Sequence, residues 1–196
     1  MAVISRTSIK QLVEKGDIII SPYNESKIGN CSVDVSLGKW YFLQKGGTRS
    51  SLPPAPIDTS EETIWDSEPQ QIKDYLIIWP GEMILITTEQ FIGSRKECTT
   101  MAKTKSSLAR FGLDLCGSSG WGDIGYINRW AFPLHNRSKF ILKLKLGTWI
   151  GQIVFLSVSD VEKSYTQGGS YQSTDDIDKL IKDWDPRSVL PKKLST

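Results

Sequence analysis

The feature that most constrains this chain is a series of short apolar stretches with the two-residue period of β-strands. Val33, Val35 and Leu37 alternate with polar residues, and residues 150–156 form an almost unbroken apolar run. Similar stretches lie at residues 18–20, 40–43, 75–79, 83–87 and 140–146. Very little sequence of helical period separates them, whereas a parallel sheet needs crossover helices between its strands. The pattern therefore predicts a mainly β fold, an antiparallel barrel or sandwich.

Proline and glycine divide these stretches. Pro80-Gly81 lies between residues 75–79 and 83–87. The fixed φ of proline beside the permissive φ of glycine favours a tight turn, so we predict a β-hairpin there. Residues 46–71 hold four prolines among many Ser, Thr and acidic residues. This composition predicts a long surface excursion with little regular structure.

Two short helices are predicted near the ends of the chain. The first covers about residues 5–14, with Ser5 as a candidate cap and Gly16 where the helix would end. The second follows Thr174 and Asp175, either of which would cap it. The rest of the C-terminal tail is polar, so we expect it to dock on the β-structure without folding alone.

Composition limits the classes of partner. A formal net charge of +2 is too small to indicate nucleic acid or an anionic membrane, so any anionic ligand must be bound locally. No stretch approaches the roughly 20 apolar residues of a membrane span, and we see no signal peptide. We expect a cytoplasmic protein.

Cys31, Cys98 and Cys116 fit neither a disulfide framework nor a zinc pattern, and we interpret them as reduced core thiols.

Two segments carry candidate chemistry. Lys105, Ser106 and Ser107 place a cation and two hydroxyls where a short helix could start, a position that suits phosphate oxygens. The alternative is that the serines simply cap the helix. Residues 120–126 form a glycine-rich turn with one carboxylate, Asp123, which could act as general base toward a water. The alternative is a turn aspartate that bonds its own backbone.

These segments resemble motifs of the dCTP deaminase and dUTPase superfamily. KSSLARFGL at residues 105–113 resembles the SSLAR motif of dCTP deaminases. SGWGDIGY at residues 119–126 is similar to their AGWIDPGF, and LKLGTWIGQIVF at residues 144–155 is similar to their LRPGMRIGQLxF. NCSVDVSLG at residues 30–38 resembles GxSxDVxLG, and SYQST at residues 170–174 weakly resembles KYQGQ. The similarity covers roughly the whole chain, in order.

The resemblance implies a distorted antiparallel β-barrel or jelly roll of the dUTPase type, built from residues 1–160 and followed by a tail, residues 161–196, that closes over the site. It also implies a homotrimer with sites between subunits, and Mg²⁺ bound through the triphosphate of a dCTP- or dUTP-type nucleotide. By position, Ser106 would hold the reacting water or the base, Lys105 and Ser107 the phosphates, and Arg110 the polar network near the base.

The remaining site residues follow from the same resemblance. Asp123 matches the superfamily aspartate, and Tyr126 stands where an aromatic ring packs on the deoxyribose. Gln152 matches a glutamine that reaches the nucleotide. Tyr171 and Gln172 match part of the tail that closes over the phosphates.

One departure from the deaminase pattern bears on the reaction. The deaminases carry a proton-shuttling glutamate in the strand after the glycine-rich turn, and Pro133 stands at that position here. No glutamate occurs between Glu97 and Glu162, so a small shift in alignment cannot restore it. Since one acid–base group typically contributes about 10²–10⁴-fold to a rate, deamination should be badly impaired.

Three functions remain open from the sequence. The favoured one is Mg²⁺-dependent cleavage of dUTP or dCTP to the monophosphate and pyrophosphate, with Asp123 as general base. The main alternative is deamination of dCTP to dUTP and ammonia. The third is a catalytically inactive nucleotide sensor, which the drift of the tail favours, since Ser170 replaces a family lysine.

Overall fold

The computed structural model describes residues 2–47, 56–115, 117, 119–159 and 161–192. The helices are α1 (Arg6–Glu14), α2 (Ser106–Ala109) and α3 (Ile177–Asp183), with 3₁₀ turns η1 (Glu25–Lys27), η2 (Tyr165–Gln167) and η3 (Pro186–Val189). The strands are β1 (Ile18–Ser21), β2 (Val33–Phe42), β3 (Gln70–Gln71), β4 (Tyr75–Ile78), β5 (Met83–Ser94), β6 (Cys98–Thr104), β7 (Leu113–Leu115), β8 (Trp121–Gly122), β9 (Ile127–Asn136), β10 (Leu142–Lys145) and β11 (Trp149–Ser157).

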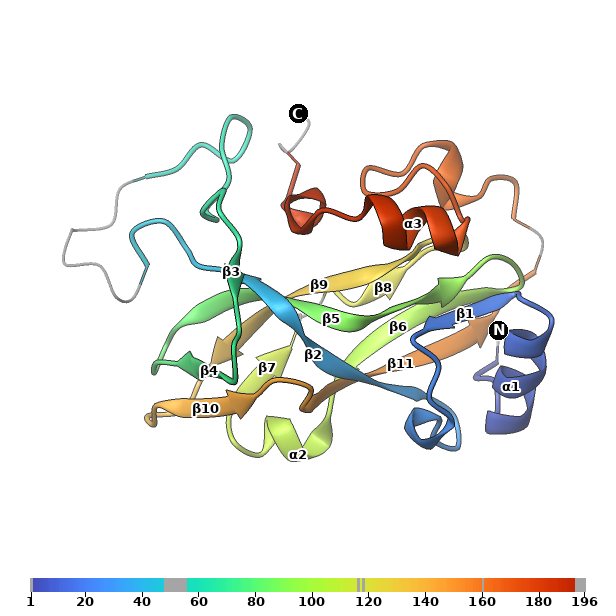
Figure 1. The fold of residues 1–196 in the computed structure, drawn as a ribbon, viewed down its shortest axis with the longest axis horizontal. Coiled ribbons are helices and arrows are strands. Elements are labelled where there is room, and N and C mark those ends of the chain that lie inside the picture. Colours follow the sequence, from blue (N-terminus) through green and yellow to red (C-terminus); the bar gives the residue numbers. More distant parts are fainter. Residues whose placement is uncertain (1, 48–55, 116, 118, 160, 193–196) are drawn as a thin grey trace.

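Most strands belong to one curled antiparallel sheet, in the order β7-β9-β5-β2-β11-β6-β8. β1 adds to β5 and β3 adds to β2, while β4 and β10 form a separate two-stranded sheet. The large sheet bends into a half-barrel, with α1 near one end and the β4–β10 pair near the other (Figure 1). The predicted mainly β, antiparallel fold is confirmed.

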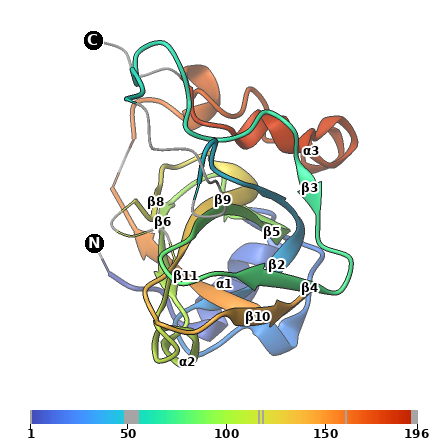
Figure 2. The same cartoon turned by 90° about the vertical axis from the view of Figure 1, so that its left-hand side faces the viewer.

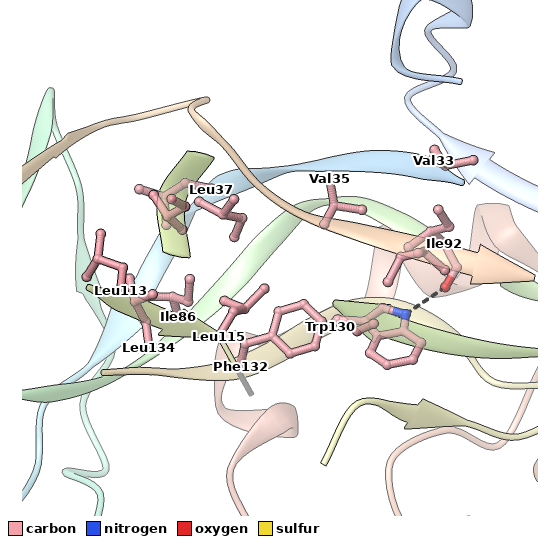
Figure 3. Close-up of a cluster of buried hydrophobic side chains, with 14 of the residues drawn as sticks. Val33, Val35, Leu37, Ile86, Ile92, Leu113, Leu115, Trp130, Phe132 and Leu134 are labelled. Atoms are coloured by element: carbon pink, nitrogen blue, oxygen red, sulfur yellow. Dashed lines mark hydrogen bonds between the residues drawn. The ribbon is translucent and has the colours of Figure 1, made fainter. Parts of the chain in front are cut away.

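The core fills the concave side of the curled sheet (Figure 3). Trp130, Phe132 and Leu134 of β9 point inward and are at most 4% exposed, whereas the residues between them are half-buried. This alternation is the two-residue strand period that buries one face of a sheet. The indole N–H of Trp130 donates to the carbonyl of Ile92 on β5 (3.0 Å), so the one polar atom of the ring is satisfied inside the core.

Helix α1 confirms the N-terminal prediction. The hydroxyl of Ser5 accepts a hydrogen bond from the backbone N–H of Ser8 (3.3 Å), which satisfies one of the free N–H groups of the first turn. Ile9 is fully buried. Gly16 has a φ of +76°, a left-handed conformation that glycine adopts without steric cost and that ends the helix.

The predicted hairpin at Pro80-Gly81 is wrong. The turn forms, with Gly81 at φ +74°, but β4 pairs with β10, Leu76 lying opposite Leu144. β5 pairs instead with β1, β2 and β9. Turn residues fix only the local change of direction, whereas burial of Leu76 and Ile78 against the core selects the pairing partner.

Other boundaries also differ from the predictions. The stretches around Val35 and Trp40 form one strand, β2, which is buried on both faces over its first six residues. Asp176 caps α3 in place of Thr174 or Asp175, because its carboxylate accepts from the N–H groups of Asp178 and Lys179. Between residues 56 and 71 the only strand is β3, as predicted for the excursion, while residues 48–55 lie outside the described residues.

A second, smaller core lies on the outside of the sheet, where Trp65 of the excursion and Val189 of the tail pack on Phe42 and Leu85. The interpretation as core thiols is confirmed for Cys98 and wrong for Cys31. Cys98 is buried, and burial raises the pKa of its thiol to about 11, whereas Cys31 is exposed, and Cys116 lies outside the described residues. Among the described residues, no helix is long and apolar enough to cross a membrane.

Candidate nucleotide site

The residues singled out from the sequence form two groups at opposite sides of the chain. Lys105 directly follows the end of β6, beside α2, whereas the turn with Asp123 follows β8, which pairs with Thr100 near the start of β6. The stretch from residue 99 to residue 105 spans about 20 Å at the usual rise of about 3.3 Å per residue. Figures 1 and 2 both place α2 on the side of the molecule opposite the C-terminal tail.

In the first group, Lys105 is paired within its own chain. Its ammonium forms an ion pair with Asp34 of β2 (2.6 Å) and lies 4.8 Å from the ring centroid of Trp149. Its side chain makes no capping bond to α2. A phosphate would therefore share this cation with a carboxylate that is mostly buried.

The polar side chains of α2 point outward. Leu108 is buried and anchors the helix, while Ser106, Ser107 and Arg110 are exposed. The side-chain amide of Gln152 lies in the same region of the sheet, since Gln152 is opposite Asp34 of β2. The first group thus presents two hydroxyls and a guanidinium on an exposed surface.

In the second group, a tightly held turn presents Asp123. The N–H of Tyr126 donates to the carbonyl of Asp123 (3.0 Å), and the N–H of Gly125 donates to Ser94 (2.7 Å). Gly125 has a φ of +89°, and a Cβ there would come within 2.0 Å of the hydroxyl of Ser164, so only glycine fits. The Asp123 side chain is exposed. Among the described residues, no hydrogen bond joins its carboxylate to its own turn, which disfavours the alternative of a turn-capping aspartate.

Asp123 lines a cavity of about 690 Å³ between β8 and the start of the tail. The lining residues are Thr99, Trp121, Asp123, Ile124, Val158, Val161, Lys163, Ser164, Tyr165, Gln167, Gly168, Gly169 and Ser170. Trp121, Lys163 and Tyr165 were not predicted from the sequence. Trp121 stands inside the glycine-rich motif and could have been included, whereas Lys163 and Tyr165 lie in a polar stretch with no local signal.

Three tyrosines separate this cavity from a second one. Tyr126 packs edge-to-face on Tyr165, with ring centroids 5.1 Å apart, and the hydroxyl of Tyr165 accepts a hydrogen bond from the N–H of Tyr171 (3.3 Å). Burial raises the pKa of Tyr126 and of Tyr165 above that of an ordinary tyrosine. Both phenols are therefore neutral at physiological pH.

Gln172 fastens the tail to the turn. Its side-chain carbonyl accepts from the N–H of Ile127 (2.7 Å), and its amide N–H groups donate to the carbonyls of Gly125 (2.8 Å) and Thr174 (2.7 Å). All of these partners are backbone groups, two at the turn and one in the tail. Gln172 was expected to contact nucleotide. In the structure these side-chain hydrogen bonds position the tail.

The second cavity, of about 370 Å³, is largely apolar. It is lined by Trp65, Leu85, Ser119, Tyr126, Ala131, Pro133, Tyr171, Val189 and Pro191. Pro133, which the motif resemblance places at the position of the deaminase glutamate, is part of its wall. None of these lining residues carries a carboxyl group, so no proton-shuttling acid faces this space.

The tail is held beside this cavity by a stacked cation. The Arg129 guanidinium of β9 lies 4.8 Å from the Trp184 ring centroid and 5.1 Å from that of Phe91. Burial lowers the pKa of Arg129, yet an arginine stays charged. Desolvated cation–π contacts of this kind reach about 2 kcal/mol.

Replacing Trp184 by alanine is expected to loosen the tail without unfolding the half-barrel. We expect the free energy of unfolding to fall by about 1–2 kcal/mol and trypsin to cut faster after Lys179 and Lys182. Mass spectrometry of timed digests, with denaturant unfolding, measures both. Ile181→Ala is the matched control, since Ile181 is 46% exposed on α3. Equal cleavage rates for the two variants would contradict this account of the tail.

A curled antiparallel half-barrel with a carboxylate-bearing turn beside a cavity defines the class: a β-barrel protein with a candidate small-molecule site next to its C-terminal tail. A family model described as dCTP deaminase-like matches residues 3–158. The chain therefore belongs to the dCTP deaminase-like family.

Two relatives carry the name "dCTP deaminase, dUMP-forming". The protein from Methanopyrus kandleri is 30% identical, covering 87% of this chain and 91% of the relative. The one from Nanoarchaeum equitans is 28% identical, covering 83% of this chain and 88% of the relative. A solved 2'-deoxycytidine 5'-triphosphate deaminase from Agrobacterium tumefaciens has a TM-score of 0.55 at 14% identity, covering 79% of this chain and 48% of that one. This chain thus spans about half of the solved one, and at this identity the likeness concerns the fold alone.

Proposed function

We propose that this protein hydrolyses pyrimidine deoxynucleoside triphosphates, dUTP or dCTP, to the monophosphate and pyrophosphate. The observation that carries the proposal is the exposed Asp123 carboxylate on the 690 Å³ cavity, next to an apolar cavity that has no acid in its lining. In the reaction, a water oxygen attacks the α-phosphorus, its proton passes to Asp123, and the bond to the bridging oxygen breaks as pyrophosphate leaves. One carboxylate is sufficient for this proton transfer.

The separation of the two residue groups supports a homotrimer with shared sites. The end of β6 beside Ser106 lies about 20 Å from the part of β6 beside Asp123, by the rise of a strand, so the two groups do not meet within one chain. In a ring of three copies, α2 of one subunit would face the Asp123 cavity of the next. Ser106 and Arg110 would then hold the water and the base from the neighbouring subunit.

The other site residues take supporting roles in this proposal. Tyr126 would pack against the deoxyribose, and its neutral phenol suits contact with a sugar. Lys105 and Ser107 would bind phosphate oxygens from the neighbouring subunit, and Gln152 would reach the same nucleotide. Tyr171 and Gln172 would close the tail over the ligand, Gln172 by bonding the backbone of the turn.

The side chains that line the cavity would suit Mg²⁺ that is bound through the triphosphate of the nucleotide. The lining offers one carboxylate, Asp123, with several hydroxyls, and the described residues contain no group of three His, Cys, Asp or Glu side chains arranged around a metal. Mg²⁺ usually takes one or two carboxylates plus phosphates and water. When bound, it would offset the developing charge on the phosphate oxygens.

Deamination is the second candidate, because the relatives' names include it. It requires water to add at C4 of cytosine while ammonia leaves, with proton transfers to and from both groups. Pro133, Ala131 and Leu85 line the apolar cavity, and none of these side chains can transfer a proton. The structure therefore favours cleavage at phosphate over replacement of the amino group.

The test is to incubate purified protein with Mg²⁺ and either dCTP or dUTP, and to resolve the products by chromatography with a parallel ammonia assay. We expect dCMP or dUMP with pyrophosphate, and no ammonia. Formation of dUTP or dUMP from dCTP with release of ammonia would establish deamination and refute the argument from Pro133. Binding without any product would indicate a nucleotide sensor.

A further inference from the structure

A basic extension adjoins the Asp123 cavity. A pocket of about 280 Å³ is lined by Arg95, Lys96, Glu97, Ile124, Val158, Ser159, Val161, Lys163 and Ser164. Five of these residues, Ile124, Val158, Val161, Lys163 and Ser164, also line the 690 Å³ cavity. The two spaces are therefore neighbours that share one wall, and Lys163 stands in that wall.

The linings of these two spaces carry charges of both signs. The larger cavity is lined by one carboxylate, Asp123, and one cation, Lys163. The extension adds Lys96 and Glu97, whose charges are opposite in sign. It also adds Arg95. Arg95 is already engaged, because its guanidinium donates to the carbonyls of Gly16 (2.8 Å) and Asp175 (2.9 Å). Among the described residues Lys163 has no ion-pair partner, so its charge is available to a ligand.

From this arrangement we infer that Lys163 binds the leaving pyrophosphate of the triphosphate, an inference that rests on the proposed function. A water activated by Asp123 must meet the α-phosphate close to that carboxylate. The β- and γ-phosphates are repelled by the carboxylate and attracted by the cation in the same lining. The hydroxyls of Ser164 and Ser170, which also line the cavity, can donate hydrogen bonds to their oxygens.

This assignment makes Lys163 a residue that distinguishes phosphate chain lengths. A monophosphate ends beside Asp123 and gains nothing from the cation, whereas a triphosphate gains a charge-assisted contact. The product monophosphate would therefore be released more readily than the substrate. A merely structural lysine would affect all nucleotides alike.

The experiment compares binding of dUMP and a non-hydrolysable α,β-imido analogue of dUTP, with Mg²⁺, by calorimetry. For Lys163→Met we expect the triphosphate analogue to bind about 10- to 100-fold more weakly, with dUMP affinity unchanged within about twofold and Lys163→Arg close to wild type. Inorganic pyrophosphate should displace the analogue from wild type but not interact measurably with the Met variant. Lys182→Met is the control, since Lys182 is exposed on α3 and lines neither cavity.

Each outcome decides between the two proposals. If wild type binds the analogue and Lys163→Met binds it equally well, the assignment of Lys163 is wrong while the proposed function stands. If the Met variant loses dUMP and analogue in the same proportion, the lysine has only a structural role and the assignment is again wrong. If wild type binds no nucleotide, the proposed function fails and this inference fails with it.

Discussion

Replacing Asp123 by asparagine should lower the rate of triphosphate cleavage by about 10²- to 10⁴-fold, the usual loss on removal of a general base. Asparagine keeps the size and shape of the side chain and one acceptor oxygen, but it cannot accept the proton of the attacking water. The turn itself should persist, because its hydrogen bonds are made by backbone groups of Tyr126 and Gly125. Pyrophosphate release from dUTP and dCTP at saturating substrate gives the rate directly.

Two controls make this result specific. Asp183→Asn removes a carboxylate from the exposed face of α3 and should cleave at the wild-type rate. The Asp123→Asn variant should also bind the α,β-imido analogue and melt at a temperature close to that of wild type. Undiminished cleavage by a well-folded Asp123→Asn protein would remove Asp123 from the mechanism.

Mixing two inactive variants should restore activity if each site is built from two subunits. Arg110→Ala removes a contribution from α2, and Asp123→Asn removes the base from the other side of the molecule. When the two proteins are unfolded together at equal amounts and refolded, random assembly gives about one quarter of the sites with both residues intact, as follows from a cyclic oligomer with head-to-tail contacts. We therefore expect roughly that fraction of wild-type activity, from two preparations that are each nearly inactive.

The control for this experiment uses the double variant. A chain that carries both Arg110→Ala and Asp123→Asn, mixed with wild type under the same conditions, also leaves about one quarter of the sites intact under this geometry. Mixed with either single variant, it should leave none. Failure of the two single variants to complement, with both shown to assemble, would mean that one chain holds a complete site.

The elements that were predicted correctly from the sequence are those that depend on residues close to one another along the chain. Helix α1 depends on the spacing of Ile9 and its neighbours, on the Ser5 cap and on the positive φ of Gly16, all within about a dozen residues. The strands follow from the same kind of local period. Burial of alternate residues on β9, as at Trp130 and Phe132, is the direct result of that period.

Pairing of the strands could not be predicted in this way. Pro80-Gly81 has all the local features of a hairpin turn, but hairpins also require that the flanking strands bury the same face together. Here Leu76 and Ile78 pack on the main core from a separate sheet, and the choice depends on residues far along the chain. The long β2 strand is a similar case, since its first stretch pairs with β11 whereas its second stretch pairs with β3 and β5.

The candidate site shows the same difference between features set by local sequence and features set by distant residues. Motif resemblance pointed to Asp123 and Tyr126, and the structure puts both beside cavities. It did not point to Lys163 or Tyr165, because their position depends on how Gln172 ties the tail to residues 125–127. Nor could it indicate that Lys105 pairs with Asp34, a contact between residues 71 positions apart.

The pairing of β4 with β10 has a consequence for the newly made chain. Tyr75 lies opposite Lys145, a difference of 70 positions, so a ribosome must add that many residues after Tyr75 before the partner strand is complete. At about 5–20 residues per second, this delay lasts several seconds. During that interval Leu76 and Ile78 stay unpaired next to Tyr75 and Ile77, an apolar strand with a free edge of the kind that invites aggregation. Chaperone binding to nascent chains should therefore concentrate on this strand, and cease once residue 145 has emerged.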